Sequence, residues 1–308
     1  MPLQIAITGA TGFIGSNLIS KLCRGGYNVR ALTRTPKNSH HKVTWITGSL
    51  EDADALVELC ANAHVVIHCA AVVRGNSLDY FRATNVRGTA LLLQALKKTG
   101  FSGKFLLLSS LAARYPEYSW YAQTKKEAEE LVLGGQLPFT TTVFRPTAVY
   151  GPGDREIQPL FKLMKGGWLI APANKQARIS LLHVDDLVMA IECWLQSNNE
   201  CGVFELDDGT LNGFTLAELS AIGEITWGRR VMKIWIPINI LRLIAHINLF
   251  LAKILGYQVM LSPGKVNEVV HQNWVCDNAS ISHKLNWKPK QKLADRIDDA
   301  AREYSLEL

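Results

Sequence analysis

The first fifteen residues constrain the fold more than any other segment of this chain. Residues 3–8 form a short apolar run that predicts a buried strand, and a glycine-rich run, residues 9–15, follows it directly. A helix with its apolar face on Leu18, Ile19 and Leu22 comes next. A strand, a glycine turn and a helix in this order predict a dinucleotide-binding βα unit.

Each glycine of the turn has its own physical role. Gly9 permits the tight turn, Gly12 lets the backbone approach a pyrophosphate, and Gly15 lets the helix pack closely on the strand. The free amides and the positive end of the helix dipole then attract the anion. The spacing is G-x-x-G-x-x-G. The expected cofactor contacts in this segment are Gly9, Thr11, Gly12, Phe13, Ile14 and Gly15.

The first two-thirds of the chain alternates strand and helix patterns, which predicts a parallel sheet covered on both faces. The further strands are expected at residues 28–33, 43–47, 65–68, 104–108, 141–144 and, late in the chain, 203–206. The helices are expected at residues 52–60, 85–98 and 121–133, with another opening at His183.

Composition excludes several classes of function. With 308 residues the chain can bury a large core, and its net charge of +6 is spread without a basic run of the kind that binds nucleic acid. The six cysteines show no metal-ligand spacing and are expected to be reduced thiols. No secretory signal pattern opens the sequence, so we expect a cytoplasmic protein. Because the positive charge is not concentrated in a run, we also expect that the protein binds no nucleic acid.

Tyr121 and Lys125 lie one helical turn apart in the motif Tyr-Ala-Gln-Thr-Lys, and their side chains share one face. A lysine ammonium favours the phenolate and lowers the pKa of the phenol, so the pair can transfer a proton near neutrality. The alternative is an exposed helix that happens to carry both residues. Its place downstream of a nucleotide-binding start favours catalysis.

Taken together, several motifs in their shared order resemble the extended short-chain dehydrogenase/reductase family, of the NAD-dependent epimerase/dehydratase type. They are TGATGFIG at the start, HCAA at residues 68–71, the pair Ser109-Ser110, YAQTK, Arg145-Pro146 with YGPG, and HVDDL. The resemblance covers nearly the whole chain. It implies a Rossmann-type doubly wound parallel sheet with a small C-terminal substrate lobe.

The resemblance also assigns catalytic roles to Ser110, Tyr121 and Lys125. Tyr121 would exchange a proton with the substrate oxygen, Ser110 would hydrogen-bond the same oxygen, and Lys125 would hold the ribose hydroxyls. Ser109 is the rival of Ser110, but side chains alternate along a strand and the family pattern favours the second serine. The short separation from Ser110 to Tyr121 is unusual for the family.

Cofactor choice is expected at the end of the second strand, where an acid binds the ribose of NAD and an arginine receives the 2′-phosphate of NADP. Arg34 stands there without an acid, so NADP is favoured and NAD stays open; the alternative is a solvated loop charge. For His68 a packed core histidine is the rival of a cofactor contact. The remaining expected cofactor contacts are Leu50, His68, Ala70, Ala71, Tyr121, Lys125, Arg145 and Pro146.

His183, Asp185 and Asp186 are residue types found in metal and catalytic sites, but a third metal ligand at suitable spacing is missing from the sequence. Two acids at the start of a helix are explained by capping and the helix dipole. We therefore predict a structural role for this motif and no metal site.

The substrate is less constrained. Nucleotide-sugar members of the family carry an asparagine just after the Arg-Pro step, where this chain has Thr147. Residues 235–255 are strongly apolar, with their polar members near one helical stripe. This segment is expected to be a helix that is a lid over an apolar substrate, a peripheral membrane contact, or part of the lobe core or of a homodimer.

We therefore predict an NAD(P)-dependent oxidoreductase that transfers hydride to or from a secondary alcohol or ketone of an apolar substrate. The alternatives are a nucleotide-sugar epimerase or dehydratase that recycles its cofactor, and a non-catalytic NAD(P)-binding subunit. The expected cofactor-binding domain is residues 1–150 with residues 180–207 returning to it. The expected substrate lobe is residues 151–179 and 208–308.

Overall fold

The computed structural model describes residues 3–39, 42–198 and 200–301. The chain divides into two compact units. Unit 1 comprises residues 1–73, 77–145 and 191–204, and unit 2 comprises residues 74–76, 146–190 and 205–308.

Unit 1 is built on a seven-stranded sheet with the order β11-β6-β5-β4-β1-β2-β3. The strands are β1 (Gln4–Thr8), β2 (Asn28–Thr33), β3 (Val43–Thr47), β4 (Val65–His68), β5 (Lys104–Leu108), β6 (Thr140–Pro146) and β11 (Gly202–Leu206). Strands β1 to β6 run parallel. The strand order reverses on either side of β1, as in a doubly wound Rossmann-type sheet.

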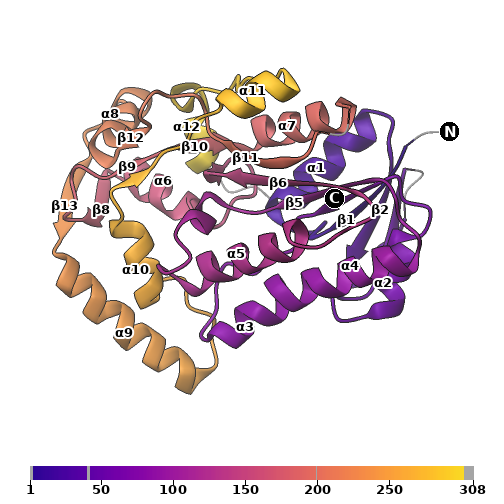
Figure 1. Cartoon of the computed structure of the whole chain (residues 1–308). Coiled ribbons are helices and arrows are strands. Elements are labelled where there is room, and N and C mark those ends of the chain that lie inside the picture. The colour runs from indigo at the N-terminus through magenta and orange to yellow at the C-terminus, as the bar shows by residue number, and fades with distance from the viewer. Residues whose placement is uncertain (1–2, 40–41, 199, 302–308) are drawn as a thin grey trace. The chain divides into compact units, whose positions relative to one another are not determined.

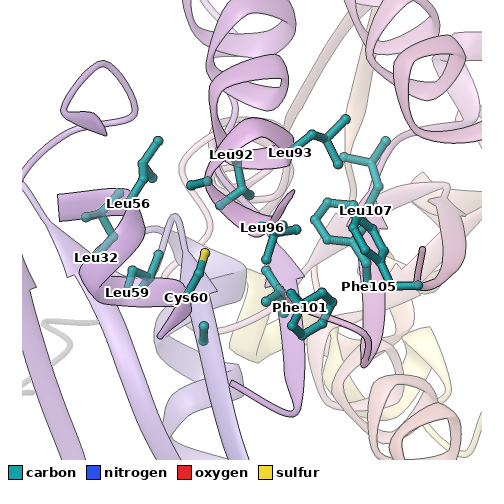
Figure 2. Packing of buried hydrophobic residues seen from close by; sticks show 14 of the residues in the cluster. Leu32, Leu56, Leu59, Cys60, Leu92, Leu93, Leu96, Phe101, Phe105 and Leu107 are labelled. Carbon is teal, nitrogen blue, oxygen red and sulfur yellow. The ribbon is translucent and has the colours of Figure 1, made fainter. Parts of the chain in front are cut away.

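Helices cover both faces of this sheet, with α1 on one side and α4 and α5 on the other (Figure 1). The helical segments of the first two-thirds are α1 (Phe13–Arg24), α2 (Ala53–Cys60), α3 (Leu78–Arg82), the π-helical η1 (Ala83–Arg87), α4 (Gly88–Lys98), the 3₁₀ turn η2 (Leu111–Arg114) and α5 (Trp120–Leu133). Figure 2 shows the packing of buried residues from α2 and α4 against Phe105 and Leu107 of β5. The buried face of each helix thus matches the sequence periodicity that predicted it.

Side-chain caps place two of these helices. The Asp52 carboxylate accepts a hydrogen bond from the amide of Ala55 (3.0 Å) and starts α2. The Ser119 hydroxyl accepts one from Ala122 (3.0 Å) and starts α5, which puts Tyr121 in the first turn of that helix.

Unit 2 contains three small sheets and several helices around a separate core that includes Phe161, Leu219 and Ile297. The sheets pair β7 (Ala148–Tyr150) with β10 (Leu181–His183), β8 (Trp168–Pro172) with β13 (Met232–Ile236), and β9 (Arg178–Ile179) with β12 (Phe214–Thr215) and β14 (Asn273–Trp274). The helices are α6 (Gln158–Lys165), α8 (Leu216–Trp227), α9 (Ile238–Leu255), α10 (Pro263–Val270), α11 (Ala279–Leu285) and α12 (Leu293–Ala301), and α7 (Val184–Gln196) begins in unit 2 and ends in unit 1.

One predicted element is wrong at its start. The sequence predicted a helix from residue 235, but Trp235 and Ile236 belong to β13 and pair with β8, and the helix begins at Ile238. Pro237 is the N-cap of α9. It has no backbone N–H to donate and a fixed φ, so it divides an apolar run into a strand and a helix.

Candidate active site

The glycine turn is shaped so that side chains are excluded from it. Gly9 has a φ of +68°, and a Cβ built there would lie 2.5 Å from the backbone nitrogen of Ala70. A Cβ on Gly15 would collide with the carbonyl of Gly9. Gly12 is the N-cap of α1, whose first turn has no acidic residue. The first amides of α1 therefore meet an approaching phosphate without a competing carboxylate.

Ala70 and Ala71 follow β4, beside the glycine turn, because β4 pairs with β1 in the sheet. Both residues are half-buried. The amide of Ala70 donates to the hydroxyl of Thr8 (3.4 Å), the last residue of β1. The two strand ends thus place the expected contacts of the turn and of the HCAA motif together, at the carboxyl edge where open α/β sheets bind ligands.

His68 is buried, and both its ring nitrogens are engaged. Nδ1 lies 2.5 Å from the hydroxyl of Thr8 and Nε2 lies 2.9 Å from the hydroxyl of Thr89. Burial, with a smaller contribution from the charge of Lys125, lowers the pKa of His68 to about 3. The ring is therefore neutral at physiological pH and joins β1, β4 and α4. These contacts support the packed core histidine over the cofactor contact.

The two serines after β5 point to different environments. Ser109 is buried, and its hydroxyl donates to a carboxylate oxygen of Glu129 (2.5 Å). Ser110 is half-buried, and its hydroxyl accepts a hydrogen bond from the amide of Ala112 (3.2 Å). Ser109 is thus committed to the interior, which leaves Ser110 as the serine with accessible surface, in line with the expected alternation.

Lys125 is almost completely buried, with 3% of its surface exposed. Its ammonium donates to the carbonyl of Leu108 (2.6 Å), the residue just before the serine pair. Burial lowers the pKa of Lys125 to about 8, although Glu129 opposes that shift. The side chain still carries its charge for most of the time at neutral pH, close to the end of β5. The Tyr121 side chain, one turn earlier on α5, is half-buried.

Glu129 is a site residue that the sequence reading missed. It is completely buried, and Arg145 donates to both its carboxylate oxygens (2.8 and 2.5 Å). Arg145, an expected cofactor contact, thus uses its guanidinium to hold Glu129, and Pro146 is buried at the end of β6. The available signal was the spacing: Glu129 follows Lys125 by four residues, so both lie on one face of α5.

Asn85 is a second residue that was missed. Its side-chain oxygen accepts from the amide of Val72 (2.8 Å), and its nitrogen donates to the carbonyl of Val72 (3.2 Å) and to the hydroxyl of Thr124 (3.0 Å). Asn85 lies in η1, where the helix widens into a π-turn. One amide therefore ties the segment after β4 to the helix that carries Tyr121 and Lys125, and π-turns are common at functional sites.

The basic residues around β2 have different environments. Arg30 donates to the carbonyls of Glu58 (2.8 Å) and Ala61 (2.6 Å) at the end of α2. The ammonium of Lys37 lies over the ring of Trp45, 5.0 Å from its centre. Arg34 is exposed directly after β2. The contact of Arg34 with a 2′-phosphate stays a prediction.

The structure also shows the surroundings of Leu50 and of the HVDDL motif. Leu50 is partly buried and packs against the unit 1 core beside Gly88 of α4. The two acids of the HVDDL motif hold the C-terminal segment. Asp186 accepts from the amides of Lys290 (3.0 Å) and Gln291 (2.9 Å), and Asp185 pairs with Arg296. These contacts account for both carboxylates structurally.

The residues of unit 1 fit a dinucleotide. The turn at Gly9, Gly12 and Gly15 leads into the first amides of α1, which can bind a pyrophosphate, and Ala70 and Ala71 adjoin it. A buried lysine, a half-buried tyrosine and a half-buried serine lie on neighbouring elements, α5 and the end of β5. This set can bind an anionic cofactor and move a proton at a substrate oxygen.

Comparisons with known proteins identify the family. The model of the NAD dependent epimerase/dehydratase family matches residues 5–206. A ceramide reductase of Caulobacter vibrioides is 30% identical over 283 residues, covering 90% of this chain and 87% of the relative. A 3 beta-hydroxysteroid dehydrogenase/Delta 5-->4-isomerase of Mycobacterium tuberculosis is 28% identical over 217 residues, covering 60% of this chain and 58% of the relative.

Solved structures share the fold. The UDP-glucuronic acid 4-epimerase of Bacillus cereus, solved with UDP-glucuronic acid and NAD, has a TM-score of 0.75 and 20% identity over 97% of this chain and 98% of its own. The family match covers more than half of the chain, and the relatives are extended short-chain dehydrogenases, reductases and epimerases. The chain is therefore an enzyme that belongs to the NAD dependent epimerase/dehydratase family.

Proposed function

We propose that this protein is an NAD(P)-dependent oxidoreductase that transfers hydride to or from a secondary alcohol or ketone of an apolar, lipid-like substrate. The observation that carries the proposal is the buried Lys125 on the same helical face as Tyr121, with Ser110 at the end of β5. A cofactor-binding protein without catalysis has no need of a proton donor supported in this way.

The bound nicotinamide supplies or accepts the hydride. Tyr121 donates a proton to the carbonyl oxygen in reduction, or removes it from the hydroxyl in oxidation. The charge of Lys125 stabilises the phenolate form of Tyr121, and burial strengthens that effect because the local dielectric is low. Ser110 hydrogen-bonds the substrate oxygen on which negative charge develops.

The proposed substrate class is supported by Thr147 and by the names of two relatives. Thr147 occupies the position after the Arg-Pro step, and its side chain is buried, so it does not reach out to a substrate phosphate. The relatives at 30% and 28% identity are named for a ceramide and for a hydroxysteroid. Both names describe largely apolar molecules. An apolar substrate of this kind gains its binding free energy from burial and needs no phosphate anchor.

NADP is the proposed cofactor, because Arg34 is exposed at the end of β2. A guanidinium binds a phosphate through paired, charge-assisted hydrogen bonds. The family as a whole binds NAD, and the solved relative from Bacillus cereus contains it. The preference for NADP is therefore a property that we assign to this chain.

The test is Tyr121→Phe, which removes the hydroxyl and keeps the ring. With a long-chain aliphatic ketone or a 3-ketosteroid, we expect NADPH consumption to fall at least ~10²-fold while NADPH binding stays within about twofold. Tyr80→Phe, at an exposed tyrosine on α3, is the matched control and should keep full activity. Wild-type rates in Tyr121→Phe would contradict the assigned proton transfer.

The second candidate is a nucleotide-sugar epimerase, favoured by the close fold likeness to UDP-sugar epimerases. Such an enzyme recycles its cofactor, whereas a reductase exchanges it at each turnover. Protein purified gently would then retain bound nucleotide and convert UDP-glucose without added cofactor. A reductase would release its nucleotide and depend on added NADPH.

A further inference from the structure

Helix α9 exposes an unusually broad apolar face. Of its 18 residues, Ala245 and Ala252 alone are buried. The exposed large apolar side chains on this helix are Ile240, Leu243, Ile244, Ile247, Phe250, Leu251, Ile254 and Leu255. Four of them, Leu243, Phe250, Ile254 and Leu255, have more than 60% of their surface exposed. A continuous apolar patch of this kind marks an interaction surface.

A second stripe of α9 is basic. Arg242, His246 and Lys253 are exposed, and they are four and seven residues apart, so they line up along one side of the helix. The surrounding sequence has the same sign. Residues 225–267 contain six lysines and arginines, namely Arg229, Arg230, Lys233, Arg242, Lys253 and Lys265, and no aspartate or glutamate. Two of the six pair with acids that flank this range, Lys233 with Glu224 and Lys265 with Glu268, whereas α9 itself contains no acid.

The third face of α9 holds it to the rest of unit 2. Ala245 and Ala252 lie on this face, and the side chain of Asn248 donates to the carbonyl of Leu261 (3.0 Å). Helices α9 and α10 lie side by side (Figure 1). At its start the helix follows directly from β13, which is hydrogen-bonded to β8.

These attachments decide how α9 can meet a bilayer. By length and composition it is the helix, among the described residues, that is apolar enough to cross a membrane. Its length is about 27 Å, close to the ~30 Å of a hydrocarbon core. However, both its ends return to unit 2, one face is packed, and Arg242 and Lys253 lie inside the segment. A helix with these features lies along the interface.

We propose that α9 docks this protein on the surface of an anionic phospholipid bilayer. The apolar face enters the boundary between headgroups and acyl chains, and Arg242, His246 and Lys253 lie at the level of the lipid phosphates. The charges favour a bilayer over a second copy of the chain. A two-fold interface through α9 would bring a helix with Arg242 and Lys253 and no acid against its own copy, and like charges would repel.

The proposal goes beyond the catalytic function and does not depend on it. Binding can be measured without any substrate, by flotation of the full chain with vesicles. We expect binding to vesicles of phosphatidylcholine mixed with phosphatidylglycerol, and much weaker binding to phosphatidylcholine alone. Added salt should weaken binding to the mixed vesicles, because it screens the attraction between the basic stripe and the phosphates.

Two variants separate the contributions. Phe250→Ser with Ile254→Ser removes apolar surface and should lower the vesicle partition coefficient at least ~10-fold. Arg242→Gln with Lys253→Gln should lower binding to the anionic vesicles roughly ten- to thirtyfold and leave binding to phosphatidylcholine alone unchanged. Leu211→Ser, at the apolar residue with 88% exposure outside α9, is the control and should bind like wild type.

Circular dichroism and NADPH binding equal to wild type confirm that each variant is folded. Three results would overturn the proposal: no flotation of the wild type, equal binding to both kinds of vesicle, or full binding by the Phe250 and Ile254 variant. A fourth would reassign the surface: a wild-type dimer by light scattering that dissociates in this variant, without vesicle binding, makes α9 a contact between copies of the chain.

Discussion

At the scale of single residues, Glu129 joins the helix that carries Tyr121 and Lys125 to the ends of β5 and β6. It is buried, accepts from Ser109, and is held at both oxygens by Arg145. A buried carboxylate without these partners would be costly to keep charged. With them, Glu129 keeps a negative charge near Lys125 and limits the fall in the pKa of that lysine.

Arg34 carries the prediction for cofactor choice. Arg34→Asp should raise the Kd for NADPH roughly ten- to a hundredfold, because the charge-assisted hydrogen bonds to the 2′-phosphate are lost and a like charge is introduced. The Kd for NADH should change less. Lys37→Asp makes the same change of charge three residues later and should have a smaller effect, since Lys37 lies over Trp45. Fluorescence titration of both cofactors measures the ratio.

The assignment fails if the wild type prefers NAD, or if the ratio of the two affinities is the same in Arg34→Asp. An equal shift in both variants would show that the general positive charge near β2 matters, and not a specific contact of Arg34.

At the scale of elements, the glycine turn offers a test that separates backbone strain from steric collision. Gly9 and Gly26 both have positive φ, +68° and +87°. A Cβ at Gly9 would lie 2.5 Å from the backbone of Ala70, whereas nothing lies within 4 Å of one at Gly26. Gly26→Ala should cost about 1–2 kcal/mol of the free energy of unfolding, from the left-handed conformation alone.

Gly9→Ala should lower the free energy of unfolding clearly more than Gly26→Ala. Both variants strain the backbone, but at Gly9 the new Cβ also collides with Ala70. It should also weaken NADPH binding, because β1 and the segment after β4 must separate, whereas Gly26→Ala should bind normally. Urea unfolding and cofactor titration measure the two effects. Equal stability and equal affinity in the two variants would show that the turn tolerates a side chain.

The same elements show how much the sequence could predict. All seven strands of the unit 1 sheet lie within two residues of their expected bounds, because a buried strand bounded by turn residues is a local pattern. The catalytic motif and the glycine turn are local too. The π-turn at Asn85 and the Glu129–Arg145 pair depend on residues far apart in the chain. The start of α9 was misjudged because the apolar pattern continues through Pro237.

At the scale of the whole molecule, the chain forms two units that have separate hydrophobic cores. The predicted catalytic residues and the glycine turn all belong to unit 1, and the exposed apolar helix belongs to unit 2. Unit 1 also includes residues 191–204, where the sequence reading expected residues 180–207 to return. Burial is the main cause of the shifted pKa values of the His68, Cys60, Cys69 and Lys125 side chains in unit 1.

Buried ionisable groups make the stability of unit 1 depend on pH. The pKa of His68 is about 3 in the folded protein and about 6.5 in the unfolded chain. Between these values the unfolded chain binds a proton that the folded protein does not, so stability falls as the pH falls from 6.5 toward 3. Burial raises the pKa of Cys60 and Cys69 to about 12, so their thiols lower stability as the pH rises above 9.

Lys125 acts in the opposite direction on the alkaline side. Its pKa is about 8 in the folded protein and about 10.5 when unfolded, so stability gains as the pH rises between those values. These contributions partly cancel above pH 9, whereas nothing among these four groups offsets His68 in acid.

We therefore expect stability to change more steeply with pH on the acid side than on the alkaline side. His68 should lower the free energy of unfolding by on the order of a few kcal/mol between pH 6.5 and pH 4. Urea unfolding across this range, followed by tryptophan fluorescence, measures it. His68→Asn should be less stable than wild type at pH 7, because the bonds to Thr8 and Thr89 are weakened, and its stability should fall less on acidification. His283→Asn, at an exposed histidine on α11, should follow the wild-type curve. If His68→Asn and wild type lost equal stability between pH 6.5 and pH 4, the buried neutral ring would not be the origin of the acid sensitivity.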